Sequence, residues 1–273
     1  MLPINFHRTF IPERRYVSAL LKFAALGKQG SLSEIAEQTS IPMGESSGKT
    51  PAILDYARGM GLVEVTPKSS IKKPVLTPLG EIVYAEDKFL GEKVTQWLVH
   101  MNLCCSRVGA KAWHEVFAKS RITLGTRFTE AQLEDYLIKL FGPVKKRTRT
   151  GPLVLTYFED EALARSSVLA KEGEFLVRTK APLLDVYAIP YSAYILFLLE
   201  EFFPGQNQVT LTDFNNETSW FDICLWSQFD VEYILSVIER KGFISVDRQM
   251  KPWIIEKKAD ARDVWPLIYS EFV

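Results

Sequence analysis

Apolar and polar positions near the start of the chain alternate in a pattern that predicts three helices followed by a hairpin. Apolar residues recur at helical spacing over 14–27, which predicts the first helix. Ser33 is placed to cap a short second helix, and the Ile-Pro pair at 41–42 ends that helix. A polar turn leads into a third helix predicted over 49–60, with Gly61 as its C-terminal cap. The β-rich runs LVEV and VLTP then flank a lysine-rich turn, as expected of a hairpin.

This order of elements is typical of a winged helix-turn-helix, in which the third helix enters the major groove of DNA. We therefore expect the N-terminal part of the chain to bind double-stranded DNA. The alternative is a winged helix that binds only protein partners, because a fold does not fix a function. The side chains expected to contact DNA in this part are Ser46, Ser47, Lys49, Thr50, Arg58, Lys68, Lys72 and Lys73.

The C-terminal part of the chain repeats this pattern with different chemistry. ILSVIERKGFISV, which starts at Ile234, aligns without gaps with ILDYARGMGLVEV, which starts at Ile53, and a second short strand follows in WIIEK. We therefore expect a second winged-helix-like unit. Asp222, Asp230 and Glu232 at the start of its helix would repel phosphate, so this unit should pack internally or bind protein. The aromatic side chains expected at its protein-binding surface are Trp220, Phe221, Trp226 and Trp253.

Between the two patterns, residues 78–141 read as helical, and residues 153–180 are mixed, with short apolar runs that fit strands or an extended segment. Thr129 and Gln132 have the spacing of a capping box at the start of one of the predicted helices. The predicted fold class is mainly α with small β wings, in which winged helix-turn-helix units are joined by a helical middle region. Four segments are predicted: an N-terminal winged helix over 1–90, a helical middle region over 91–143, a basic linker and mixed segment over 144–185, and a C-terminal winged-helix-like unit over 186–273.

Charge adds one more candidate contact with DNA. Lys+Arg and Asp+Glu both total 33, which argues against a protein that coats DNA without specificity but leaves room for a local basic face. The densest basic run lies in the linker segment. It can contact phosphates or form an exposed linker, and both interpretations stay open. Its members, added to the residues expected at DNA, are Lys145, Lys146, Arg147 and Arg149.

Length and composition limit the setting of the protein. The chain has 273 residues and is 47% apolar, enough for more than one core. No apolar run approaches the roughly 18 residues of a membrane span, and the N-terminus lacks a secretory pattern. Cys104, Cys105 and Cys224 include no CxxC pair, which predicts reduced thiols, no zinc site and a cytoplasmic location. A homodimer is a possible assembly, because winged-helix proteins often dimerise.

No catalytic constellation stands out, and we expect neither a cofactor nor a metal. GESSGKT at 44–50 has too few residues between its glycines for a phosphate loop. His100 and His114 lie among aromatic residues and are expected to serve packing or to lie at the surface. The cluster Glu159–Glu161 could bind a metal in a nuclease, but it lacks the lysine at nuclease spacing, and an acidic helix start is the simpler explanation.

Three motifs in order resemble a known family. They are FHxTFxxxR at 6–14, then LTPLGE at 76–81, and WLxH at 97–100. Together they resemble a prokaryotic domain-of-unknown-function family encoded near DNA phosphorothioation and other defence-island genes, over about residues 5–270. The family more often has an acidic residue where Arg8 stands. The resemblance implies a role in DNA modification or anti-phage defence, and it carries no established active site.

These observations predict a DNA-binding accessory or regulatory protein without catalytic activity of its own. Its expected partners are double-stranded DNA and other proteins of a modification or anti-phage defence complex, with no membrane. One alternative is a scaffold that binds only protein through its winged helices. The other is a metal-dependent nuclease centred on Glu159–Glu161.

Overall fold

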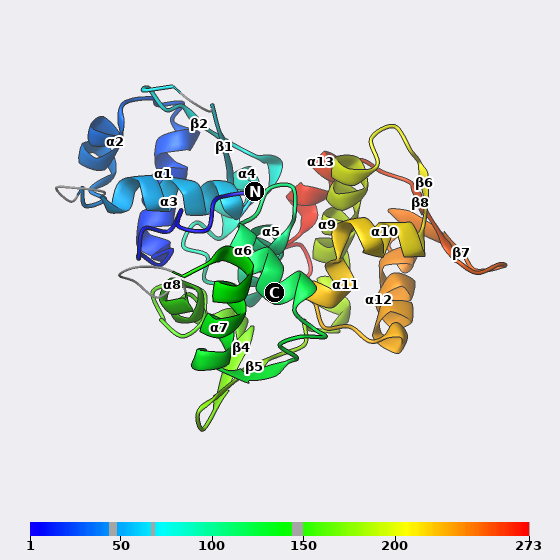
Figure 1. Cartoon of the computed structure of the whole chain (residues 1–273). Helices are drawn as coiled ribbons and strands as arrows, with labels where there is room; N and C mark the ends of the chain where they lie inside the picture. The colour runs from blue at the N-terminus through cyan, green and yellow to red at the C-terminus, as the bar shows by residue number, and fades with distance from the viewer. Residues whose placement is uncertain (44–47, 67–68, 144–149, 273) are drawn as a thin grey trace. The chain divides into compact units, whose positions relative to one another are not determined.

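The chain is mainly α-helical with small antiparallel sheets and divides into two compact units (Figure 1). The computed structural model describes residues 1–43, 48–66, 69–143 and 150–272. Unit 1 comprises Met1–Thr179 and unit 2 comprises Lys180–Val273. The division into four segments stays a prediction. Across the described residues, no helix has the length and apolar character that crossing a membrane requires.

Unit 1 begins with three helices and a hairpin, in the order that the sequence predicts. The elements are α1 (Arg14–Ala25), α2 (Leu32–Thr39), α3 (Lys49–Gly59), β1 (Val63–Val65) and β2 (Pro74–Leu76), followed by α4 (Pro78–Glu86). The cap of α2 is Ser31, not Ser33. Ser31 and Glu34 form a capping box, in which the Glu34 N–H donates to Ser31 Oγ and the Ser31 N–H to Glu34 Oε2.

The LTPLGE motif joins the hairpin to α4 at a close backbone approach. Thr77 Oγ1 donates to the Gly61 carbonyl at 2.5 Å and accepts the Gly80 N–H at 2.9 Å, so it caps α4. A Cβ at Gly80 would lie 1.9 Å from the Leu62 carbonyl oxygen, which only glycine avoids. Capping and close packing of the backbone therefore explain the threonine and the glycine of the motif without any ligand.

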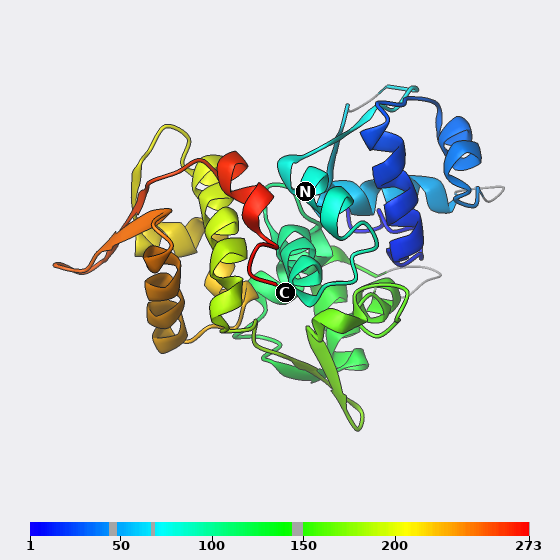
Figure 2. The ribbon, with the colours of Figure 1, turned by 180° about the vertical axis from the view of Figure 1, so that it is seen from behind.

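The rest of unit 1 combines helices with a small sheet. The helices are α5 (Lys93–Cys104), α6 (Lys111–His114), α7 (Glu130–Phe141) and α8 (Thr150–Leu155). A π-helical turn over Glu115–Lys119 continues α6, and the capping box of Thr129 and Gln132 opens α7 as predicted. The antiparallel sheet has the order β3 (Arg127–Thr129), β5 (Phe175–Arg178), β4 (Leu169–Glu172). The β4–β5 hairpin lies in the segment predicted as mixed, and it extends from the helices of unit 1 (Figures 1 and 2).

The core of unit 1 contains a closed polar network. Trp113 Nε1 donates to the Tyr157 hydroxyl at 3.0 Å, and the same hydroxyl is hydrogen-bonded to His100 Nδ1 at 2.6 Å. Burial lowers the pKa of His100 well below its ordinary value and raises the pKa of Tyr157. Both groups are therefore neutral and buried, which agrees with the prediction of a packing role for His100.

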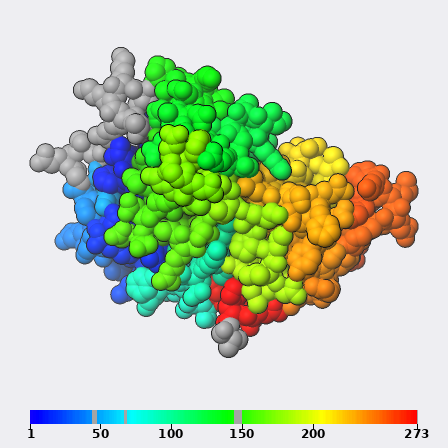
Figure 3. Space-filling view, turned by 90° about the horizontal axis from the view of Figure 1, so that it is seen from below, coloured from blue at the N-terminus to red at the C-terminus, as the bar shows by residue number. Residues whose placement is uncertain are grey.

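Unit 2 repeats the order of helices and hairpin on a different core. Its helices are α9 (Ala188–Phe202), α10 (Leu211–Thr218), α11 (Trp220–Ile223), α12 (Gln228–Arg240) and α13 (Ala261–Val264). Its antiparallel sheet has the order β6 (Gln208–Thr210), β8 (Ile254–Lys257), β7 (Ile244–Asp247). The β7–β8 hairpin, orange in Figure 3, projects from unit 2. The expected second set of helix and hairpin is therefore present.

The aromatic residues of unit 2 correct one expectation. Trp220 lies at the centre of the unit's core, with ring centroids 5.1 Å from Trp226 and 5.7 Å from Phe221. Trp220, Phe221 and Trp226 are all buried, because they fill the space between α9 and the helices that follow it. They do not form the exposed protein-binding surface that was expected. Only Trp253 is half-buried, with the Arg248 guanidinium 5.3 Å over its ring.

Candidate nucleic-acid interface

Helix α3, the helix expected to enter the major groove, lies mostly inside unit 1. Its buried residues include Tyr56, whose hydroxyl donates to the Phe10 carbonyl at 3.0 Å and whose ring packs on Phe6 and Trp113. A Cβ at Gly59 would lie 2.7 Å from the side chain of Leu2. The N-terminal segment and the helices after the hairpin thus cover the face that a major-groove helix must expose.

Two of the predicted DNA contacts on α3 have partners inside unit 1. Lys49 forms an ion pair with Glu13 and lies 4.9 Å over the ring of Tyr16. Burial opposes ionisation of Glu13, but hydrogen bonds from Lys49 and Arg15 lower its pKa overall. Thr50 is 1% exposed and bonds to the Ile41 carbonyl. As a correction, Thr50 has no surface to offer a phosphate, and Lys49 already neutralises a carboxylate.

The accessible edge of α3 carries a basic cluster. Arg58 lies 3.4 Å from Asp55, and both side chains are partly exposed. Burial raises the pKa of Asp55, and the charges of Arg58, Arg8 and Lys72 act in the opposite direction. The charges of these three cations, which come from α3, the N-terminal loop and the hairpin, therefore act on the same carboxylate. We call Arg8, Arg58, Lys72 and the adjacent Lys73 the basic edge.

Backbone geometry holds two parts of the basic edge in place. Lys72 exchanges backbone hydrogen bonds with Gly30 at 2.7 and 3.0 Å, which ties the hairpin to the loop after α1. Arg8 and Thr9 have φ of 49° and 75°, and the Thr9 N–H donates to His7 Nδ1 at 3.1 Å. This conformation leaves Arg8 exposed. The sequence reasoning gave Arg8 no role, although it lies within the FHRTF motif.

Seven of the predicted DNA contacts lie outside the described residues. These are Ser46, Ser47, Lys68, Lys145, Lys146, Arg147 and Arg149. Their role stays a prediction. Of the remaining predicted contacts, Lys72 and Lys73 on the hairpin and Arg58 on α3 lie at the surface or partly exposed.

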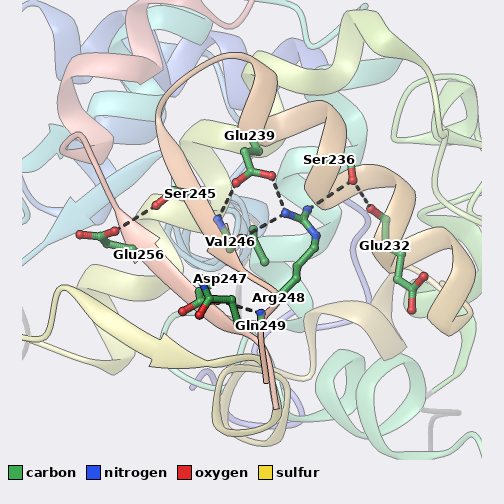
Figure 4. A network of polar contacts seen from close by, with 9 residues as sticks. All are labelled: Glu232, Ser236, Glu239, Ser245, Val246, Asp247, Arg248, Gln249 and Glu256. Carbon is green, nitrogen blue, oxygen red and sulfur yellow. Dashed lines mark hydrogen bonds and ion pairs between the residues drawn. The ribbon is translucent and has the colours of Figure 1, made fainter. Parts of the chain in front are cut away.

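In unit 2 the corresponding helix α12 buries one face and exposes the other, and a polar network ties it to its hairpin (Figure 4). Glu239 on α12 accepts the Val246 N–H at 2.7 Å and forms an ion pair with Arg248 at 2.6 Å. Arg248 also donates to Ser236 at 3.3 Å. The network holds the hairpin against the C-terminal half of α12. Because Arg248 is paired with Glu239, it adds no net positive charge to this part of unit 2.

The two units carry opposite charge. Unit 1 has 25 Lys and Arg against 19 Asp and Glu, a formal charge of +6, whereas unit 2 has 8 against 14, a charge of −6. The two charges cancel, so the net charge of the whole chain is zero. The positive charge of unit 1 favours contact with phosphates, and the negative charge of unit 2 opposes it.

The geometry gives no sign of a metal centre in the part of the chain that the structure describes. No three His, Cys, Asp or Glu side chains there come together in a way that could hold a metal ion. Glu159–Glu161 lie in turns after α8 rather than at a helix start. The Asp160 carbonyl accepts from Arg14 at 2.6 Å, which gives this loop a structural role.

The fold and surface define a class: a mainly helical protein of two oppositely charged units, in each of which a set of helices leads into a β-hairpin. No family model and no curated protein sequence match the chain. Two solved structures share its fold, titled "SspB crystal structure" with a TM-score of 0.68 and "Magnesium ion-bound SspB crystal structure" with 0.67. Each is 15% identical and covers 98% of this chain and 87% of its own. This likeness shows the fold.

Proposed function

We propose that the chain is a DNA-binding accessory protein of a DNA phosphorothioation or related anti-phage defence system, and that both units are winged helices. Unit 1 binds the phosphate backbone of duplex DNA, and unit 2 binds a protein partner. The carrying observation is the basic edge, in which Arg58 lies 3.4 Å from Asp55 and the charges of Arg8 and Lys72 act on the same carboxylate. The charge of +6 on unit 1 supports the same assignment.

The proposed contact differs from that of a typical winged helix. Because most of α3 is buried, base reading by that helix is not part of the proposal. The basic edge instead contacts phosphates, which fix the position of a protein on DNA without reading its sequence. Any preference for sequence or for modified DNA then belongs to a partner.

The defence setting is supported by two independent likenesses. The motifs of the N-terminal half resemble a family encoded near phosphorothioation genes. The fold is that of SspB over 98% of the chain.

A salt series on the whole chain tests the DNA assignment. We expect a labelled duplex to bind, with an affinity that falls steeply between about 50 and 200 mM salt. The variant Arg8→Gln, Lys72→Gln, Lys73→Gln removes three charges and leaves the Arg58–Asp55 pair intact. It should lower the slope of log affinity against log salt by about 3.

A matched variant of unit 2 controls for net charge. Lys251→Gln, Lys258→Gln, Arg262→Gln also removes three exposed cations. It should leave the salt slope unchanged, because these residues lie on the acidic unit. Equal losses in the two triple variants would overturn the assignment to the basic edge. No binding of duplex at low salt by the unmodified chain would favour a scaffold that binds only protein, which the burial of α3 also supports.

A further inference from the structure

Unit 2 exposes apolar side chains on two neighbouring segments. On α12, Phe229 is 79% exposed and Tyr233, one turn later, is 40% exposed. Leu184 and Val186, also exposed, lie in residues 180–187, which we call the strap. Single exposed apolar residues are ordinary, but a contiguous group indicates an interaction surface.

Polar contacts show that the strap runs along α12. Lys180 at its start forms an ion pair with Asp230 at 2.7 Å, in the first turn of the helix. Near its end Asp185 accepts from the Tyr233 hydroxyl at 2.9 Å and lies 3.5 Å from Arg240. The strap therefore follows the helix from its first turn to its last. Leu184 and Val186 are the chain neighbours of Asp185, the residue that accepts from the Tyr233 hydroxyl.

The surface also has a defined charge. Asp185 lies within it, and Glu232 is next to Tyr233 on α12. Arg240 has Asp185 as its partner, and the whole unit has a charge of −6. The acidic surroundings repel nucleic acid and attract a cationic partner. Two aromatic side chains at i and i+4 offer the anchors that dominate protein interfaces.

We propose that the strap and the outer face of α12 dock a basic amphipathic segment of a protein partner. Apolar side chains of the segment contact Phe229, Tyr233 and Leu184, and its Lys or Arg side chains approach Glu232. This inference rests on the proposed accessory role, in which unit 2 binds protein. It does not require that unit 1 binds DNA.

Labelled synthetic peptides of equal length test the proposal with the full chain. One peptide is helical with leucine on one face and lysine on the other, the second replaces lysine by glutamate, and the third is the lysine peptide with its order scrambled. By fluorescence anisotropy at about 0.15 M salt, we expect only the first peptide to bind well. The variant Phe229→Ala, Leu184→Ala should weaken it by about tenfold or more, which is about 1.4 kcal/mol.

Two matched variants separate the docking surface from exposed apolar residues elsewhere. Ile122→Ala in unit 1 and Met250→Ala in the hairpin of unit 2 also remove highly exposed side chains. Both should bind the first peptide as the unmodified chain does. Equal weakening in these variants, or equal binding of the scrambled peptide, overturns the proposal.

Light scattering distinguishes a second copy of the chain from a different partner. Self-association that disappears in Phe229→Ala, Leu184→Ala would assign the surface to another copy and overturn the proposed partner. A monomer that binds the first peptide supports it. The same variant should bind duplex DNA as the unmodified chain does. If the unmodified chain binds the first peptide but does not bind DNA, only the function proposed for unit 1 is refuted.

Discussion

Helices α3 and α12 occupy the same place in the two units but present different surfaces. Each precedes a β-hairpin and is followed by a glycine with positive φ, Gly61 at 70° and Gly242 at 82°. The N-terminal segment and the middle helices cover α3, whereas α12 exposes Phe229 and Tyr233. Equivalent local sequence therefore produces equivalent backbone, and the segments that pack on it later decide which helix can meet a partner.

The units also differ in how they should respond to acid. All three histidines, His7, His100 and His114, lie in unit 1 and are buried. Burial lowers the pKa of each, to about 4 for His7. The unfolded chain binds these protons near 6.5, so it holds more protons than the folded chain below that pH. The free energy of unfolding of unit 1 should therefore fall as the pH drops below 6.5.

This is the largest expected difference between the units. His7 alone accounts for about 3 kcal/mol of lost stability by pH 4. In unit 2 the pKa values of Asp230, Glu256 and Asp260 are lowered. Their contribution to stability is therefore lost only when the pH falls below their ordinary pKa values of 3.8–4.5. Hydrogen exchange, corrected for its intrinsic rate, should show unit 1 opening first between pH 6.5 and 5.

A single substitution checks the origin of the acid response. His7→Asn keeps an acceptor for the Thr9 N–H but does not titrate. It should reduce the number of protons that unit 1 takes up on unfolding, given by the slope of its unfolding free energy against pH, by up to one. Uniform weakening of both units between pH 6.5 and 5 would contradict the assignment to the histidines.

The two glycines after these helices provide a second, smaller contrast. An added Cβ at Gly61 would lie 2.6 Å from Asn102 Nδ2, which donates to the Met60 carbonyl, whereas nothing lies within 4 Å of a Cβ at Gly242. Positive φ alone costs a side chain about 1–2 kcal/mol. Displacing the buried Asn102 adds about 1–3 kcal/mol. Urea unfolding should therefore show a clearly larger loss for Gly61→Ala than for Gly242→Ala, and equal losses would contradict the packing described for α3.

Local signals explain which parts of the fold could be predicted. The order of helices and hairpin follows from apolar spacing, and the capping box of Thr129 and Gln132 follows from two residues three apart. The same rule favours Ser31 over Ser33 as the cap of α2, because Glu34 stands three residues after Ser31. This error was avoidable from the sequence.

Burial by distant segments explains what the sequence could not provide. Nothing near Thr50 in the sequence tells that α3 is covered, because Leu2, Phe6 and Trp113 belong to other parts of the chain. Trp220 likewise stands beside acidic residues in the sequence, which suggests exposure, but α9 packs against it in the structure. The basic edge unites a loop, a helix and a hairpin, so no single stretch of sequence contains it.

The smallest expected contrast concerns an ion pair with reversed polarity in the two units. In the ungapped alignment Lys49 matches Asp230. Lys49 is paired with Glu13 just before α1, and Asp230 is paired with Lys180 ahead of α9. Both helices are thus anchored to the chain that precedes the first helix of their unit. Glu13 has a second partner in Arg15, whereas Asp230 also accepts two hydrogen bonds from Ser227.

Lys49→Met should therefore cost less stability than Asp230→Asn. Glu13 keeps Arg15 after the first change, so the loss should stay near 1 kcal/mol or below. The second change weakens both the ion pair and the cap of α12, for about 1–2 kcal/mol. Lys49→Met should also leave the salt slope of DNA binding unchanged, since Lys49 already neutralises Glu13. A slope lowered by about 1 would place Lys49 among the phosphate contacts and return α3 to the DNA interface.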